Sequence, residues 1–443
     1  MSKLPLMTRE LDDVIAWRAG RTVTAAEFIF QARWLADRLR REDQVINLCQ
    51  DRHTFSLAFA AAILAQTTTL LPANRLPDTV DALVNRYPGC LILSDQPIEG
   101  LHHRLLDPGM ALDQSGRAEH VPEPDESLLA AVVFTSGSTG PSSAVKKPWR
   151  TLHDSSLINA AEYGPRERAH VLATVPPQHM WGLETSVLLP WFGPAIIASA
   201  QPFFAADIIA LLNQLPRPRA LVSTPIHLRN LVESGLDIPA IDRIYSATAP
   251  LGAKLAGELE RQTSARVTEV YGCSEAGCLA HRRAARDEPW QLFKAFSLLE
   301  DHGQFRVHAE HLPEDVTLLD HLEVLDDGRF RLAGRHGDLV NIAGKRASLA
   351  ELTQRLLDIS GVTDGVIFQP PENDEGRVTR LAALVVAPQL SERQIRQALS
   401  KRIDPAFMPR PLRRVPALPR AESGKLPHQS LVHFYQQVCE PAR

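Results

Sequence analysis

The feature of this sequence that most constrains its fold is a series of short, uninterrupted apolar segments. They are VINLC, CLILS, LAAVVF, HVLAT, AIIAS and ALVST, at residues 45–49, 90–94, 129–134, 170–174, 195–199 and 220–224. Strands that are buried on both faces, as in parallel sheets covered by helices, have continuous apolar sequences. Between such segments, residues 24–41 and 203–215 carry apolar side chains at the three- and four-residue spacing of helices. The alternation predicts an α/β fold with parallel sheets.

The chain is long enough for more than one domain. Its 443 residues exceed what one ordinary core holds. After about residue 337 the pattern changes to GVIFQ, LAALVVAP and the helix-like SERQIRQALSKRI, which indicate a small α+β unit. This segment contains 15 Lys and Arg against 11 Asp and Glu, whereas the whole chain has a net charge of -4. We therefore predict a large N-terminal domain, residues 1–336, and a small C-terminal domain, residues 337–443.

Composition excludes several classes of protein. A net charge of -4 on 443 residues creates no basic field of the kind that binds nucleic acid. No apolar run is long enough to span a membrane, and the N-terminal sequence lacks the apolar stretch of a secretory signal, so a cytoplasmic location is expected. The five cysteines, Cys49, Cys90, Cys273, Cys278 and Cys439, show no metal-ligand spacing and are expected to be reduced.

A small polar loop follows the apolar segment 129–134. It consists of Thr135, Ser136, Gly137, Ser138, Thr139 and Gly140, and two lysines follow at 146 and 147. Successive backbone N–H groups in such a turn form an anion-binding concavity, and glycines allow close approach. The loop is therefore interpreted as a phosphate cradle, with Lys146 or Lys147 as a positive charge. It is not a Walker A loop, because G-x-x-x-x-G-K-[ST] is absent. The alternative is an ordinary Ser/Gly-rich surface loop.

Further motifs follow in a fixed order. VYGCSEAG places Glu275 after an apolar segment, Asp320 precedes the pair Gly334-Arg335 by fourteen positions, and Lys425 ends the loop LPRAESGK. Together with the polar loop, these blocks resemble the adenylate-forming superfamily of acyl- and aryl-CoA synthetases, luciferases and peptide-synthetase adenylation domains. The resemblance covers roughly residues 130–430. It implies that a carboxylic acid attacks the α-phosphate of ATP, and that a phosphopantetheine thiol then accepts the acyl group.

The resemblance assigns a role to each motif. It implies an ATP site made of residues 135–140, Lys147, Ser246, Ala247, Thr248, Tyr271, Gly272, Ser274, Glu275, Asp320, Arg335 and Arg346. Glu275 is a hard oxygen ligand suited to Mg²⁺, and the Asp320 carboxylate can accept both ribose hydroxyls. Lys425 would neutralise charge that develops between the acid and the α-phosphate. Without the resemblance, these three residues could be a solvated glutamate, an ion-pair partner and a surface lysine.

The segment PPQHMWGLETS is the expected acid-binding segment. The resemblance places His179 at the acid carboxylate or adenylate, with Trp181 and Gly182 in the pocket floor. A lone histidine is otherwise more often a structural residue.

Two departures from the superfamily pattern matter. The lysine after the phosphate loop is displaced, so Lys147 is assigned and Lys146 stays an alternative. Gly337 occupies the hinge position about which the mobile C-terminal domain would swing, and glycine gives that backbone wide freedom.

The short N-terminal domain and the segments FTSGSTGPSSAVKKPW, PPQHMWGLETS and STPIHLRNL resemble ligases that load aryl or acyl groups onto carrier proteins in aryl-polyene and xanthomonadin-type pathways. This implies a small aromatic acid such as 4-hydroxybenzoate, loaded onto an acyl carrier protein. Two alternatives are an acyl-CoA synthetase for a short or medium fatty or aryl acid, and a non-catalytic adenylate-binding relative. Arg410, Arg413, Arg414 and Arg420 precede Lys425 and form a candidate surface for an acidic carrier protein, or simply a solvated basic face.

Overall fold

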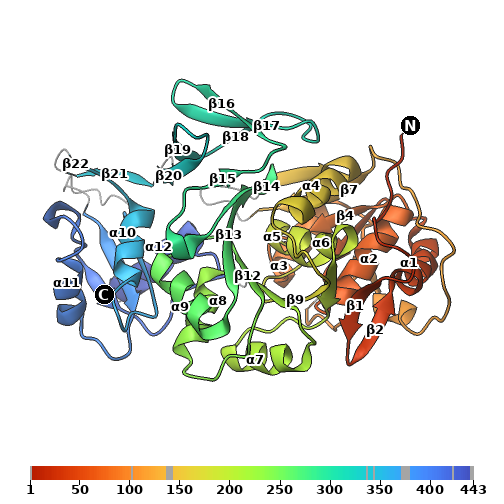
Figure 1. Ribbon diagram of the computed structural model, residues 1–443, viewed down its shortest axis with the longest axis horizontal. Coiled ribbons are helices and arrows are strands. Elements are labelled where there is room, and N and C mark those ends of the chain that lie inside the picture. The colour runs from red at the N-terminus through yellow and green to blue at the C-terminus, as the bar shows by residue number, and fades with distance from the viewer. Residues whose placement is uncertain are drawn as a thin grey trace.

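The computed structural model describes residues 2–100, 103–135, 143–335, 338–342, 345–370, 380–421 and 424–439. It confirms an α/β architecture built on two large sheets, which lie in the right-hand and central parts of Figure 1, with the C-terminal part at the left. Within the described ranges no helix is both long and apolar enough to cross a membrane. The loop residues Ser136, Gly137, Ser138, Thr139 and Gly140 and the hinge position Gly337 lie outside the described residues.

The first large sheet has six strands in the order β6-β5-β3-β4-β7-β8. Their bounds are β3 (Gln44–Asn47), β4 (Thr68–Leu71), β5 (Leu91–Leu93), β6 (Leu105–Leu106), β7 (Leu129–Phe134) and β8 (Ala144–Pro148). All neighbours are parallel except β8, which returns antiparallel to β7 after the polar loop. The apolar segments 45–49, 90–94 and 129–134 thus form β3, β5 and β7, as predicted.

The second large sheet has nine strands in the order β15-β14-β13-β12-β11-β9-β10-β1-β2. Their bounds are β1 (Val14–Arg18), β2 (Arg21–Thr24), β9 (Ala169–Ala173), β10 (Ala195–Ala198), β11 (Arg219–Ser223), β12 (Arg243–Ser246), β13 (Arg266–Cys273), β14 (Gly277–Arg282) and β15 (Gln291–Leu292). The run from β1 through β10, β9, β11 and β12 to β13 is parallel, whereas β2, β14 and β15 pair antiparallel at the two edges.

Helices cover the faces of both sheets. They are α1 (Ala25–Leu39), α2 (Arg52–Leu64), α3 (Pro77–Arg86), α4 (Trp149–Glu162), α5 (Met180–Leu183), α6 (Leu189–Phe192), α7 (Ala205–Gln214), α8 (Pro225–Glu233) and α9 (Ala253–Thr263), with short 3₁₀ turns η1 (Pro108–Ala111) and η3 (Ala284–Arg286). The helix predicted at 24–41 is α1, where Thr24 forms a capping box with Glu27. The one predicted at 203–215 is α7.

A set of small antiparallel sheets follows the second large sheet and projects at the top of Figure 1. One contains β16 (Ser297–Asp301), β17 (Gln304–His308) and β18 (Val316–Thr317), and the other pairs β19 (Asp320–Val324) with β20 (Phe330–Arg335). The second hairpin places the Cα atoms of Asp320 and Arg335 opposite each other. Asp320 and Arg335, fifteen positions apart in the sequence, therefore become neighbours.

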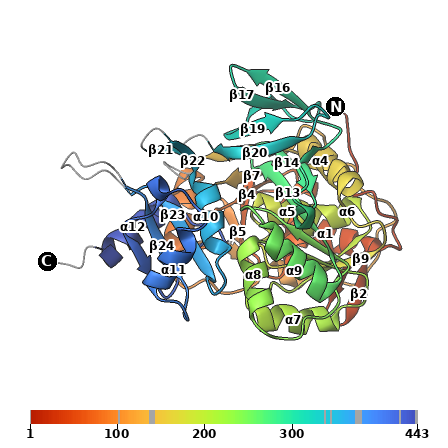
Figure 2. The same ribbon diagram turned by 60° about the vertical axis from the view of Figure 1, so that its left-hand side comes forward.

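The C-terminal part has its own cores. Its elements are β21 (Leu339–Ile342), β22 (Lys345–Ser348), α10 (Leu349–Leu357), β23 (Asp364–Phe368), β24 (Ala382–Val386), α11 (Glu392–Leu399), the 3₁₀ turn η4 (Pro405–Phe407), β25 (Leu412–Arg414) and α12 (His428–Cys439). Two apolar clusters are drawn only from residues 340–438. Figure 2 shows these elements gathered beside the larger body. The strand and helix predicted from GVIFQ, LAALVVAP and SERQIRQALSKRI form β23, β24 and α11.

Candidate active site

The candidate site lies where several parallel strands of the nine-stranded sheet end. His179 follows β9, Thr224 follows β11, Thr248 follows β12, and Glu275 follows β13. In open parallel sheets, ligands bind outside the carboxyl ends of the strands, because loops from neighbouring strands meet there. The topology therefore brings together motifs that are up to about a hundred residues apart in the chain.

Tyr271 and Asp320 form one side of this region. The Tyr271 hydroxyl donates to Oδ2 of Asp320 at 2.7 Å. The tyrosine ring is held by Trp290 and Phe330, whose ring centroids lie 5.6 and 6.0 Å away. Arg335 ends β20 opposite Asp320, and Arg346 lies in β22; only the backbones of these two arginines are described. Two of the expected nucleotide contacts, Tyr271 and Asp320, are thus joined by a direct hydrogen bond.

The segment after β12 combines a buried hydroxyl with backbone strain. Ser246 is fully buried, and its Oγ has no hydrogen-bond partner among the described residues. Ala247 is also buried, and Thr248 is exposed with φ at 78°. A positive φ is costly for a residue with a branched side chain, and such strain is concentrated at functional sites. An orphaned hydroxyl beside a strained turn is suited to a polar ligand such as a nucleotide.

His179, which follows β9, is influenced by the charge of Lys425 in the C-terminal part. Burial is the largest cause that lowers the pKa of His179 to about 4, and the positive charges of Lys425 and Arg75 lower it further. Lys425 itself is exposed. The imidazole is therefore neutral at pH 7, and it offers a polar but uncharged group that feels the charge of Lys425.

The Lys425 loop is held in place by Arg420. The Arg420 guanidinium donates to both oxygens of Asp364 at 2.7 Å, and its Nη1 donates to the carbonyl of Gly424 at 2.8 Å. The Lys425 carbonyl accepts from the N–H of Ala421 at 2.8 Å. Gly424 has φ at 77° and lies close to Thr224, where an added Cβ would come within 2.9 Å of Thr224 Oγ1. Arg420 is therefore a structural residue of this loop, not part of a free basic surface.

His179 also begins the helical segment that carries Trp181 and Gly182. It is the N-cap of α5, which continues into a π-helical turn, η2 (Glu184–Leu188). Trp181 Nε1 donates to the carbonyl of Ser223 at 3.4 Å, which ties this segment to the end of β11. A Cβ at Gly182 would overlap the carbonyl of Pro176. Glycine is therefore needed at 182 so that the helix can pack against the Pro176-Pro177 turn.

The two lysines after the polar loop have different environments. Lys147 is 1% exposed, and its Nζ donates to the carbonyl of Glu275 at 2.7 Å. Lys146 is exposed. The base of the loop is closed by Thr135 and Ser143, whose hydroxyls lie 2.6 Å apart. The Glu275 side chain is exposed beside Ser274 and Gly272, so it can reach a metal ion from the strand end.

Glu275 suits Mg²⁺ in the manner expected for a nucleotide site. Within the described ranges, no group of three or more His, Cys, Asp or Glu side chains could hold a metal ion by itself. Mg²⁺ usually takes one or two carboxylates and completes its coordination with water and substrate phosphates. One exposed carboxylate in the turn between β13 and β14 fits that pattern.

Sequence reasoning missed a buried polar cluster behind the Glu275 turn. Its members are Asn159, Tyr163, Glu184 and Cys278, all of which are buried. Burial raises the pKa of Glu184, and burial lowers the pKa of Lys147 nearby. The only sequence signal was the polar run ETS inside the apolar helix WGLETSVLLPWF, since a charged residue is rarely buried without a partner.

Arg75 was also missed. Its Nη2 donates to the carbonyl of Cys49 at 2.8 Å and approaches Oε1 of Gln178 at 3.4 Å, next to His179. It lies after β4 of the six-stranded sheet, so it brings a positive charge from one sheet to the site of the other. No local pattern marks it, because its position depends on how the two sheets pack.

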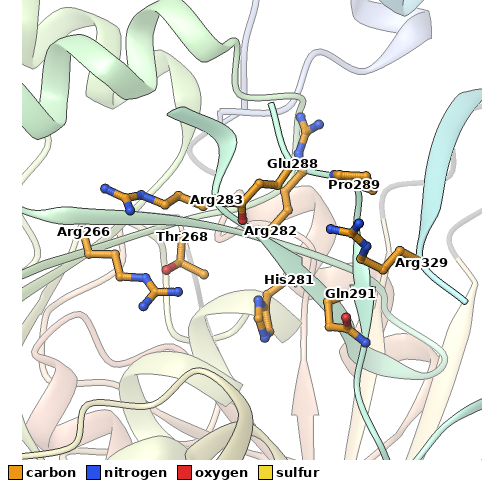
Figure 3. A pocket seen from close by; sticks show the side chains of 9 residues that line it. All are labelled: Arg266, Thr268, His281, Arg282, Arg283, Glu288, Pro289, Gln291 and Arg329. Atoms are coloured by element: carbon orange, nitrogen blue, oxygen red, sulfur yellow. The ribbon is translucent and has the colours of Figure 1, made fainter. Parts of the chain in front are cut away.

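A separate pocket of about 210 Å³ lies at the opposite end of β13 (Figure 3). Its lining includes Arg266, Thr268, His281, Arg282, Arg283 and Arg329. Three of these arginines are paired with carboxylates, Arg282 with Glu269, Arg283 with Glu260 and Arg329 with Asp327. The pocket lies at the other end of β13 from the strand ends that carry the motifs. Most of the positive charge of its arginines is already paired with carboxylates.

Comparison with known proteins shows the family to which the chain belongs. The model of the AMP-binding enzyme family matches residues 9–296, and the chain belongs to this family. It is an AMP-forming ligase of the adenylate-forming class, as the order of the motifs predicted.

Individual relatives are distant. The chain is 28% identical over 344 residues to 4-coumarate–CoA ligase of Halorhodospira halophila, covering 74% of this chain and 82% of the relative. It is 21% identical over 311 residues to 3,4-dihydroxybenzoate–[aryl-carrier protein] ligase of Bacillus anthracis, covering 67% and 72%.

Solved structures share the fold over almost the whole chain. The anthranilate CoA ligase AuaEII in complex with anthranoyl-AMP superposes with a TM-score of 0.82 at 15% identity, covering 98% of this chain and 96% of that one. ATP-bound MatB from Rhodopseudomonas palustris superposes with a TM-score of 0.79 at 20% identity, covering 97% of each. Such low identity supports the fold and not a substrate.

Proposed function

We propose that this protein joins an aromatic carboxylic acid to a phosphopantetheine thiol in two steps. In the first, a carboxylate oxygen of the acid attacks the α-phosphorus of ATP, and pyrophosphate leaves. In the second, the thiol sulfur attacks the acyl carbon, and AMP leaves. The observation that carries the proposal is that the positive charge of Lys425 acts on His179 after β9, while Asp320 is hydrogen-bonded to Tyr271 on β13 and Glu275 follows the same strand.

Each residue has a role that its environment supports. Asp320, held by Tyr271, accepts the ribose hydroxyls, and the turn at Ser246, Ala247 and Thr248 borders the adenine. Mg²⁺ bound through Glu275 would neutralise phosphate charge. The carboxylate nucleophile needs no base at neutral pH, because carboxylic acids are ionised there. Lys425 therefore serves as a positive charge near the transition state, where preorganised electrostatics contribute most.

His179 orients the acid. Because its pKa is about 4, it stays neutral while the acid carboxylate binds. Trp181 and Gly182 lie on the same turn, and we assign them to the acid pocket. Arg335 and Arg346, whose side chains are outside the described part, complete the proposed nucleotide contacts.

The aromatic substrate and the carrier protein are the finer part of the proposal. Two distant relatives carry names of ligases for aryl acids, and one of these loads a carrier protein. Both names support an aromatic acid such as 4-hydroxybenzoate, and the second also supports transfer to a carrier protein. A fatty-acyl or aryl-CoA synthetase is the second candidate, because other relatives are named as CoA ligases of fatty acids.

A panel of acids in a pyrophosphate-release assay tests this function. Each acid should be tried with CoA and separately with a phosphopantetheinylated carrier protein. We expect an aromatic acid with the carrier to give the highest catalytic efficiency. Absence of magnesium-dependent pyrophosphate exchange with every acid would favour the non-catalytic alternative.

We further propose that residues 1–336 and 337–443 are two domains, and that Gly337 is the hinge between them. Gly337→Pro should slow one half-reaction much more than the other, because proline fixes φ near -65° and removes an N–H. The two half-reactions can be measured separately, as pyrophosphate exchange and as thiol transfer from added acyl-adenylate. Gly337→Ala, which keeps the N–H, is the matched control. Equal rates for the proline variant and wild type in both assays would place the hinge elsewhere.

Reversing the charge of exposed arginines in the C-terminal part tests whether the acyl acceptor is a carrier protein or CoA. Arg410, Arg413 and Arg414 are exposed on or near β25, and Arg413 is only loosely paired with Glu392 at 3.5 Å. We expect Arg410→Glu with Arg413→Glu to slow transfer to an acidic carrier about tenfold, because complementary charge accelerates encounter. Pyrophosphate exchange should be unchanged. Equal efficiency with CoA and carrier, for wild type and variant alike, would favour the CoA-ligase candidate.

A further inference from the structure

The Lys147 side chain connects the two large sheets. Lys147 lies on β8, the edge strand of the six-stranded sheet, and Glu275 lies in the turn between β13 and β14 of the nine-stranded sheet. The ammonium donates to the Glu275 carbonyl at 2.7 Å, and the lysine is 1% exposed. A buried ammonium is costly unless it is hydrogen-bonded, so this contact is strongly favoured in the folded protein.

Glu184 contacts the other side of the same turn. The Cys278 thiol donates to Oε2 of Glu184 at 3.2 Å, and Asn159 Nδ2 approaches Oε1 at 3.5 Å. Gly277 has φ at 80°, and a Cβ there would overlap Oε1 of Glu184. Glycine at 277 therefore lets the carboxylate pack directly against the backbone that follows Glu275.

Two buried polar side chains contact the turn at different positions. Lys147 and Glu184 each favour the charged form of the other through the low-dielectric interior. Lys147 bonds the carbonyl of Glu275, and Glu184 bonds Cys278 and packs against Gly277. The exposed Glu275 carboxylate thus projects from a backbone that is held before and after Ala276.

We propose that Lys147, together with Glu184, is a positioning residue for the Glu275 turn and not a phosphate ligand. This inference rests on the proposed nucleotide site, because it concerns the turn that borders that site. For Lys147 to reach a phosphate, its ammonium would have to leave the Glu275 carbonyl and the protein interior. A positioning role affects every ligand that uses the turn, whether or not that ligand carries β- and γ-phosphates.

The probes that distinguish the two roles are ATP with MgCl₂ and AMP, titrated into the full-length protein by calorimetry. AMP keeps the α-phosphate but has no β- or γ-phosphate, so a ligand of those two phosphates contributes to ATP binding alone. We expect Lys147→Met to weaken ATP and AMP by the same factor, about tenfold, as for loss of one hydrogen bond to a charged group. Glu184→Gln should weaken both in the same way. The double variant, Lys147→Met with Glu184→Gln, should bind ATP and AMP no more weakly than the single variant with the lower affinity. Both changes release the same turn, so their effects should not add.

Lys254→Met is the matched control, since Lys254 is an exposed lysine on α9 outside the site. Lys147→Gln keeps a hydrogen-bond donor in an uncharged side chain, so its affinity for both nucleotides should lie between those of Lys147→Met and the wild type. It also replaces the methionine variant if that variant does not fold. Weaker ATP binding with unchanged AMP binding would identify Lys147 as a phosphate ligand and overturn the inference. Unchanged binding of both probes would also overturn it. If the wild-type protein binds neither probe, it is the proposed nucleotide site that fails.

Discussion

Replacing Lys425 by alanine is expected to slow adenylate formation by about 10²–10³, as for deletion of a preorganised transition-state donor. The positive charge of Lys425 lowers the pKa of His179, so the lysine acts electrostatically on the segment where charge would develop between the acid and the α-phosphate. Pyrophosphate exchange measures this step. Transfer of the acyl group from added acyl-adenylate to the thiol should be much less affected, because it involves no attack on the α-phosphorus.

Lys401→Ala is the matched control for this experiment. Lys401 is an exposed lysine in the same C-terminal part, beyond α11. We expect it to leave both half-reactions close to the wild-type rates. An equal fall of both half-reactions in Lys425→Ala would mean that the lysine does not act specifically in the first step.

Replacing Asp320 by alanine is expected to raise the KM for ATP by about 10–100-fold. Hydrogen bonds to a charged group contribute about 1.5–3 kcal/mol each, and each 1.4 kcal/mol corresponds to a factor of ten. The carboxylate is already oriented by the Tyr271 hydroxyl at 2.7 Å, so little ordering is needed when a ribose binds. Steady-state kinetics with ATP as the varied substrate measure the effect.

Two further variants show whether this effect is local. Tyr271→Phe removes the hydroxyl that orients Asp320, so it should raise the KM for ATP in the same direction but less. Asp327→Ala changes an exposed carboxylate in the turn between β19 and β20, and should leave the KM unchanged. If Asp320→Ala lowers the melting temperature but does not change the KM, its role is in folding only.

The parallel strands could be predicted from the sequence because burial on both faces removes polar residues. VINLC and LAAVVF form β3 and β7, and the continuous apolar runs after residue 169 form the centre of the second sheet. The antiparallel strands β16 and β17 could not be predicted in this way. One face of β16 is exposed and β17 alternates between buried and exposed residues, so neither has a continuous apolar run.

The motifs predicted a set of candidate site residues, but not what those residues contact. The bond between Tyr271 and Asp320 joins residues 49 positions apart, and Lys147 reaches a carbonyl 128 positions away. Such distances are set by sheet packing, about which local sequence carries little information. For the same reason Arg75 and Glu184 could not be predicted, although the side chains of both form hydrogen bonds at or beside the site.

The firm attachment of the Lys425 loop to Asp364 has a consequence for protons at the site. Arg420 binds both Asp364 and the loop, so Lys425 would travel as one unit with the C-terminal part. If the proposed swing moves that part away, His179 loses the pKa-lowering effect of Lys425, and the pKa of its imidazole would rise from about 4. The proton affinity of the acid site would then alternate with each turnover. The position of the C-terminal part and the proton affinity of His179 would therefore change together.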